Sequence, residues 1–114
     1  MSLKDLLAKL AETPEKVEFQ EVIDVIDSHY VFVPAAFQNG DTHNEAGQNN
    51  GSCKIFSFAQ LNELNEEQTL ACFGRYYRHD VLLHPENDDH QNIRNFIRFG
   101  WSGVQFDTAA LTEK

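Results

Sequence analysis

The sequence predicts a mainly α-helical fold, a small bundle of about five helices with a minor two-stranded β element and a long, ordered, Asn/Gly-rich loop. Three observations predict it. Apolar residues recur at helical spacing in several segments, two short runs are rich in β-branched and aromatic residues, and a polar stretch, 39–54, separates hydrophobic segments. A chain of 114 residues is expected to form a single domain, 1–114, with one core that needs neither metals nor disulfides.

The first two predicted helices lie within the first 30 residues. Ser2 is a suitable N-cap for a helix with an apolar face, and Thr13 and Pro14 fit the N-cap and first position of a second helix. The apolar positions are Leu3, Leu6, Leu7 and Leu10 in the first helix and Phe19, Val22, Ile23, Ile26 and Tyr30 in the second. The acidic face of the second helix is expected to face solvent, or alternatively to dock a partner.

Residues 30–33 predict a short strand, because the run Tyr-Val-Phe-Val is β-branched and aromatic and Pro34 ends it. The polar stretch 39–54 follows and holds three of the six glycines. Asn side chains bond nearby backbone, and both Gly and Asn tolerate positive φ, so we expect an ordered loop.

Three further helices are predicted after the loop. Ser52 is the expected cap of a helix over 53–64, although residues 54–58 also alternate as a strand would. The motif Asn-Glu-Glu-Gln at 65–68 fits a capping box, and the apolar stripe after it predicts one helix to about residue 83. Asp89 is the expected cap of a last helix that Gly100 closes, and strand 104–106 is expected to pair with 30–33.

The composition excludes several classes of function. Asp and Glu number 18 against nine Lys and Arg, a formal charge of -9, which argues against binding to nucleic acid or to an anionic membrane. The N-terminus lacks the pattern of a secretory signal, and no apolar run is long enough to span a bilayer. We therefore expect a soluble cytoplasmic protein in which Cys53 and Cys72 are free thiols.

The segment 47–54 places two glycines before a predicted helix start, where unpaired N–H groups attract anions. It is not a Walker A motif, because three residues rather than four separate the glycines and Lys does not follow the second. A small anion or a carboxylate is the ligand that this segment would suit. The simpler interpretation is that Asn and Gly only shape the turn.

Cys53 offers an enzymatic alternative. A thiol in the first turn of a helix and next to Lys54 would be favoured as the thiolate, and His43, His79, His84 or His90 would have to serve as its base. The other interpretation is a buried residue at a tight packing point. Cys72, between Ala71 and Phe73, is expected in the core.

All four arginines lie between Arg75 and Arg98. Arg75, Arg78 and Arg94 could converge with the loop to clamp a carboxylate or phosphate, or could simply pair with acidic residues and helix carbonyls. The histidines and Asp80 match no zinc signature, so we predict neither a metal nor another cofactor.

Four motifs in order resemble the HopJ type III effector family across nearly the whole chain. They are Phe-Val-Pro-Ala-Ala-Phe-Gln-Asn-Gly at 32–40, Asn-Glu-Ala-Gly-Gln-Asn-Asn-Gly-Ser-Cys-Lys at 44–54, Cys-Phe-Gly-Arg-Tyr-Tyr-Arg-His-Asp-Val at 72–81, and His-Gln-Asn-Ile-Arg-Asn-Phe at 90–96 with Gly-Trp at 100–101. The resemblance implies a bacterial protein. The name of the family also implies type III secretion into a host cell, but membership assigns neither a reaction nor catalytic residues. The capped, Leu-rich N-terminus differs from the unstructured, Ser-rich signals typical of that export.

The sequence thus favours a non-enzymatic binding module for a small molecule or a partner protein, with a Cys53-dependent enzyme as the alternative. An effector acting inside a host cell is a third hypothesis. The expected ligand-binding residues are Asn39, Asn44, Asn49, Ser52, Cys53, Lys54, Arg75, Arg78, His90 and Arg94.

Overall fold

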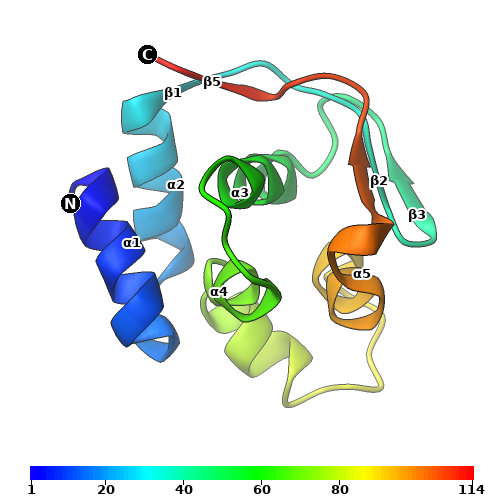
Figure 1. The fold of residues 1–114 in the computed structure, drawn as a ribbon. Helices are drawn as coiled ribbons and strands as arrows, with labels where there is room; N and C mark the ends of the chain where they lie inside the picture. The colour runs from blue at the N-terminus through cyan, green and yellow to red at the C-terminus, as the bar shows by residue number, and fades with distance from the viewer.

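Helices make up most of the regular structure in the computed structural model, which describes residues 1–114 (Figure 1). The α-helices are α1 (Leu3–Glu12), α2 (Phe19–His29), α3 (Asn50–Leu61), α4 (Glu66–Ala71) and α5 (Gln91–Phe99). There are also three short helical segments, the 3-10 turns η1 (Pro14–Lys16) and η3 (Gly100–Gly103) and the π-helix η2 (Tyr76–Val81). The predicted mainly α class is confirmed.

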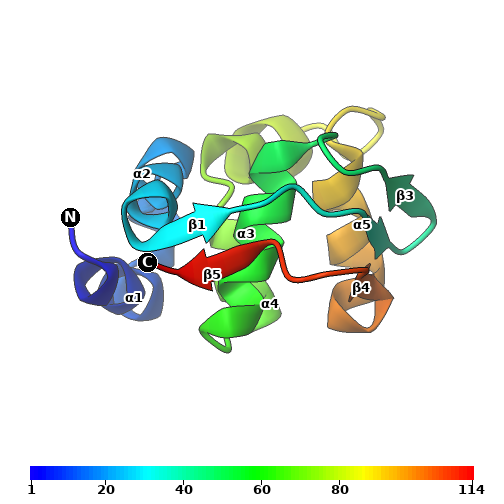
Figure 2. The same cartoon turned by 90° about the horizontal axis from the view of Figure 1, so that it is seen from above.

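The strands form two small antiparallel sheets beside the helices rather than one pair. They are β1 (Tyr30–Phe32), β2 (Phe37–Asn39), β3 (Thr42–Asn44), β4 (Val104–Phe106) and β5 (Leu111–Glu113). One sheet pairs β1 with β5, and the other has the order β3-β2-β4. Seen from above in Figure 2, β1 and β5 lie side by side, with β1 next to α2 and β5 over α3.

The predicted pairing of 30–33 with 104–106 is wrong. Tyr30 pairs with Glu113, whereas Val104 pairs with Asn39. The partner of β4 is β2, which was not predicted as a strand. Strands β2 and β3 form a hairpin around the two-residue turn Gly40–Asp41, where Gly40 has φ +58. A positive φ at the first turn position is what such tight hairpins need.

Helix α1 begins where the sequence predicts. The side chain of Ser2 accepts a hydrogen bond from the backbone N–H of Asp5 in a capping box. The second helix starts later than expected, because Thr13 and Pro14 begin only η1, and α2 starts at Phe19. Between them Val17 is extended and fully buried, which breaks the helical path.

Helix α3 is the central helix, and its apolar residues are buried on several faces. Its Phe56 ring lies 5.5 Å from the Phe73 ring and 5.1 Å from the Phe96 ring. A helix buried on several sides has weak amphipathic periodicity, which explains the competing strand prediction for 54–58. The helix starts at Asn50 with Asn49, not Ser52, as its N-cap.

The predicted Asn/Gly-rich loop is wrong in extent. Residues 39–54 include the end of β2, all of β3 and the first residues of α3, so only 45–49 connect the hairpin to the helix. The single helix predicted for 66–83 is likewise divided into α4 and η2, although Asn65 and Gln68 do form the capping box. The division lies at Gly74, which has φ +58.

Helix α5 follows a left-handed residue. His90, with φ 51, is its N-cap in place of the predicted Asp89, and it makes no side-chain capping bond. Gly100 ends the helix as predicted, with φ +64. A Cβ on Gly100 would lie 2.1 Å from Oε2 of Glu66, the end of a flexible side chain that can move, so it is the positive φ that favours glycine there.

Candidate functional site

An open pocket of about 500 Å³ lies where the beginnings of several elements meet. Its wall consists of Phe19, Thr42, Asn49, Gly51, Ser52, Phe73, Tyr76, His90, Gln91, Asn92 and Ile93. Phe19 is the first residue of α2, Tyr76 the first of η2, and Thr42 the first of β3. The pocket has the size of a small-molecule site.

The first turns of α3 and α5 both contribute to this wall. Helix geometry leaves the first-turn N–H groups without partners inside the helix, and these ends carry partial positive charge. Neither N-cap residue, Asn49 or His90, bonds them with its side chain. Both N-caps share the same left-handed conformation, φ 51 and ψ 50. The two helix ends can therefore offer backbone donors to one ligand.

Aromatic rings form another part of the wall. The Phe19 and Tyr76 rings meet edge to face with centroids 5.1 Å apart, and the Tyr76 and His90 rings lie 5.2 Å apart. Although the chain has 18 acidic residues, the wall contains no Asp, Glu, Lys or Arg. The pocket thus combines apolar surface with neutral hydrogen-bonding groups.

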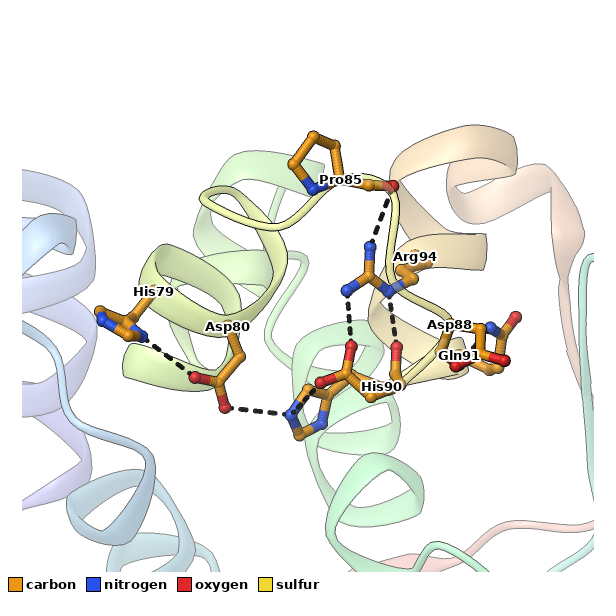
Figure 3. A network of polar contacts seen from close by, with 8 residues as sticks. His79, Asp80, Pro85, Asp88, His90, Gln91 and Arg94 are labelled. Carbon is orange, nitrogen blue, oxygen red and sulfur yellow. Dashed lines mark hydrogen bonds and ion pairs between the residues drawn. The ribbon is translucent and has the colours of Figure 1, made fainter.

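A carboxylate bridges two imidazoles at the edge of the pocket (Figure 3). Oδ2 of Asp80 lies 3.1 Å from Nε2 of His90, and its Oδ1 lies 3.1 Å from Nδ1 of His79. The hydrogen bond from His79, followed by that from His90, holds the pKa of Asp80 below its usual value. Asp80 therefore fixes the position of the one histidine in the pocket wall.

A cluster of buried amides supports the pocket from behind. Nδ2 of Asn39 donates to the carbonyl and the side-chain oxygen of Asn92, at 2.8 and 3.0 Å. Asn44 and Asn92 exchange side-chain hydrogen bonds at 3.2 and 3.0 Å, and Asn95 donates to Thr42 at 2.6 Å. These bonds attach the β2–β3 hairpin to α5 and hold two wall residues, Thr42 and Asn92.

The structure brings three of the predicted site residues to the pocket: Asn49, Ser52 and His90. Asn39 and Asn44 belong instead to the amide cluster, with exposed fractions of 0% and 1%. Asn39 keeps one buried oxygen, Oδ1, without a hydrogen-bond partner. Their role in the structure is to join the hairpin to α5.

Cys53 and Lys54 lie outside the pocket wall. Cys53 is 1% exposed, and burial raises the pKa of its thiol, which is the opposite of thiolate activation. Nζ of Lys54 pairs with Asp27 at 2.9 Å and lies over the ring of Phe32. Cys72 is fully buried, and burial raises its pKa to about 12.

The three arginines expected to form a clamp do not converge. The guanidinium of Arg78 donates to the carbonyls of Pro14 and Val17. Arg94 bonds the carbonyls of Pro85 and Asp89 and the carboxylate of Asp89 (Figure 3). It lines a separate groove with Val81, Leu82, Pro85 and Ile97. Arg75 is exposed and does not belong to the pocket wall.

Sequence reasoning missed eight wall residues: Phe19, Thr42, Gly51, Phe73, Tyr76, Gln91, Asn92 and Ile93. For Gln91, Asn92 and Ile93 the sequence did contain a signal. They follow a predicted helix start, where unpaired N–H groups can bind a ligand just as at the start of α3. No comparable signal marked Phe19, Phe73 and Tyr76, since aromatic residues at helical spacing usually indicate a core.

Comparison with known proteins gives the family. A model described as "HopJ type III effector protein" matches residues 3–111. The chain belongs to the HopJ family. The resemblance seen in the sequence motifs is thereby confirmed.

A solved structure is also similar to this HopJ-family chain. It is a crystal structure of a protein of unknown function, VPA0580, with 62% sequence identity and a TM-score of 0.99. The match covers 100% of this chain and 95% of that one. A search of curated proteins found no match.

No group of three or more His, Cys, Asp or Glu side chains is arranged to hold a metal ion. None of the helices of this HopJ-family chain is both long and apolar enough to cross a membrane.

Proposed function

We propose that this HopJ-family protein is a binding module for a small organic ligand, held in the pocket between the first turns of α3 and α5. The observation that carries the proposal is the shared wall: Gly51 and Ser52 of α3 and Gln91 and Asn92 of α5 line one cavity. Backbone N–H groups there would bond an acceptor oxygen of the ligand. The ligand is expected to be small, because the cavity holds about 500 Å³.

The aromatic side of the pocket defines the rest of the ligand. Phe19, Phe73 and Tyr76 offer apolar surface beside the polar helix ends: a Cβ on Gly51 would lie 3.0 Å from Cζ of Phe19, and the Tyr76 ring lies 5.2 Å from that of His90. A planar or apolar body would contact these rings while its acceptor group meets the N–H donors. Small aromatic acids have both parts, and they are the ligand class that we propose.

Nothing in the pocket supports the cysteine-dependent enzyme. Cys53 lies behind the wall with its sulfur 3.6 Å from the carbonyl oxygen of Ala35. A nucleophile needs access to substrate and a nearby base. The binding module therefore remains the proposed function.

A panel of small aromatic ligands tests the proposal. ¹H–¹⁵N NMR titrations would compare several aromatic carboxylates, benzoate among them, with benzylamine as a cationic counterpart. We expect the carboxylates to shift the amide signals of Gly51, Ser52, Gln91 and Asn92, and benzylamine to leave them unchanged. Absence of any shift there across the whole panel would contradict the proposal.

Ser52→Asp separates binding from folding. The new carboxylate would stand in the first turn of α3, where a negative charge stabilises a helix by about 0.3–1 kcal/mol, and would repel an anionic ligand. We expect unchanged or higher Tm together with loss of carboxylate binding. Gln105→Glu, which adds one charge at an exposed position of β4 outside the pocket wall, is the matched control and should bind as the wild type does.

A further inference from the structure

His90 differs from every other residue of the pocket wall in its chemistry. It is the only wall side chain that can gain a positive charge near neutral pH, since the wall has no Lys or Arg. Its side chain is 30% exposed, and its ring lies against that of Tyr76. Any positive charge that the wall of this pocket presents to a ligand through a side chain must therefore come from His90.

The ring of His90 is held by one of its two nitrogens. Nε2 bonds Asp80 at 3.1 Å, whereas Nδ1 has no hydrogen-bond partner within the protein. Asp89 lies farther from Nε2, at 3.8 Å, and its carboxylate is paired with Arg94 at 2.6 Å (Figure 3). The arrangement fixes the ring and leaves Nδ1 free to donate a hydrogen bond to a ligand when the imidazole is charged.

The charge near the pocket changes when His90 takes up a proton. The titratable and charged groups that face His90 are Asp80 and Tyr76 of η2 and Asp89 of the segment before α5, and Arg94 balances Asp89. Helices α2 and α3 bring no charged side chain to the wall. With His90 neutral, the carboxylate of Asp80 is an uncompensated negative charge that repels an anion. Protonation of His90 cancels it.

From this geometry we propose that His90, positioned by Asp80, recognises the carboxylate of the ligand and makes the affinity of the pocket increase as the pH falls. The inference rests on the proposed function. It adds that the ligand is negatively charged and that His90 is the residue that recognises this charge. His79 bonds the other oxygen of the same carboxylate, so it also compensates the charge of Asp80 when it is positive and should contribute a smaller part of the effect.

Binding of benzoate followed by NMR at a series of pH values tests this inference. Benzoate stays ionised between about pH 5.5 and about pH 8, a range that spans the usual titration of histidine. For the wild type we expect an affinity about tenfold higher at the acidic end, the usual size of a coupling between two sites. A fixed affinity over this range would overturn the inference and leave the proposed function standing, whereas no binding at any pH would overturn both.

Two variants and one control identify the residue responsible. His90→Asn removes the titrating ring from the pocket wall, and Asn tolerates the left-handed conformation of position 90, so we expect binding to lose most of its pH dependence and to keep only the smaller part that His79 contributes through Asp80. Asp80→Asn removes the negative charge beside the pocket, so we expect the affinity at the alkaline end of the range to rise toward that at the acidic end. The control His29→Asn changes a histidine at the last position of α2, away from the pocket wall, and should retain the wild-type profile. A His90→Asn variant with an unchanged pH profile would overturn the inference.

Discussion

Gly74 packs directly against the backbone of Phe19. A Cβ atom on Gly74 would lie 2.6 Å from the backbone nitrogen of Phe19, and the φ of Gly74 is +58. This contact joins the point where the chain turns from α4 to η2 with the first residue of α2. Because Phe19 and Tyr76 both line the pocket, it also fixes two aromatic residues of the wall relative to one another.

Gly74→Ala should therefore lower the free energy of unfolding by at least about 2 kcal/mol, from the left-handed conformation and the backbone contact together. Urea denaturation gives the value. Gly47→Ala is the matched control, since Gly47 also has positive φ but no atom within 4 Å of the place where a Cβ would stand, and its cost should be about 1–2 kcal/mol. Equal losses in the two variants would show that the Phe19 contact has no energetic role.

The amide cluster should behave as one unit. Asn44→Ala and Asn92→Ala each leave buried polar partners unsatisfied, so each should cost about 2–4 kcal/mol. The double variant should lose at least about 1 kcal/mol less than the sum of the single losses, because each change removes the partner of the other. Additive losses in urea denaturation would refute the coupling. Asn87→Ala, at an exposed position, should stay within about 0.5 kcal/mol of the wild type.

Cys53 should be unreactive in the folded protein. With 1% exposure and a pKa raised by burial, its thiol offers little thiolate to iodoacetamide at neutral pH. Alkylation of Cys53, followed by peptide mass spectrometry, should become fast only in urea. Ser102→Cys, at an exposed position, supplies a reactive reference thiol in the same fold. Rapid native alkylation of Cys53 with an inflection well below about pH 8.5 would instead favour the cysteine-dependent enzyme.

Local signals predicted the fold better than distant ones. The capping boxes at Ser2 and Asn65 and the helix end at Gly100 each depend on a few neighbouring residues, and each is present in the structure. Strand pairing depends on which segments meet in space, and the sequence contains no record of that for β1 and β5. The need for glycine at position 74 was not predicted for the same reason. It comes from the contact with the backbone of Phe19, which lies far away in the sequence.

The candidate site was predictable only where a local pattern carried it. Asn49 and Ser52 were identified because a helix start follows Gly and Asn, and they do line the pocket. The arginine clamp depended on distances that a sequence does not contain. Arg78 could bond the carbonyls of Pro14 and Val17 only because the fold places η1 beside η2. A guanidinium thus satisfied within the fold cannot be distinguished from a free one by spacing.

Cys72 should make the protein less stable in alkali. In the unfolded chain its thiol ionises near the ordinary value of 9.0, whereas burial holds the folded-state pKa at about 12. Below pH 9 both states are neutral and the thiol has no effect on the pH dependence. Above it only the unfolded state loses the proton, so the free energy of unfolding should fall by about 1.4 kcal/mol per pH unit until the folded thiol also ionises.

The comparison of the wild type with Cys72→Ala isolates this effect. The variant loses packing, a cost that should not vary with pH, and it also loses the titrating group. The difference in unfolding free energy between the two proteins should therefore shrink as the pH rises from about 9 to about 10.5, because only the wild type has this ionisation in its unfolded state. Urea denaturation at a series of pH values measures it. Parallel curves would mean that the thiol of Cys72 ionises in the folded state as readily as in the unfolded one.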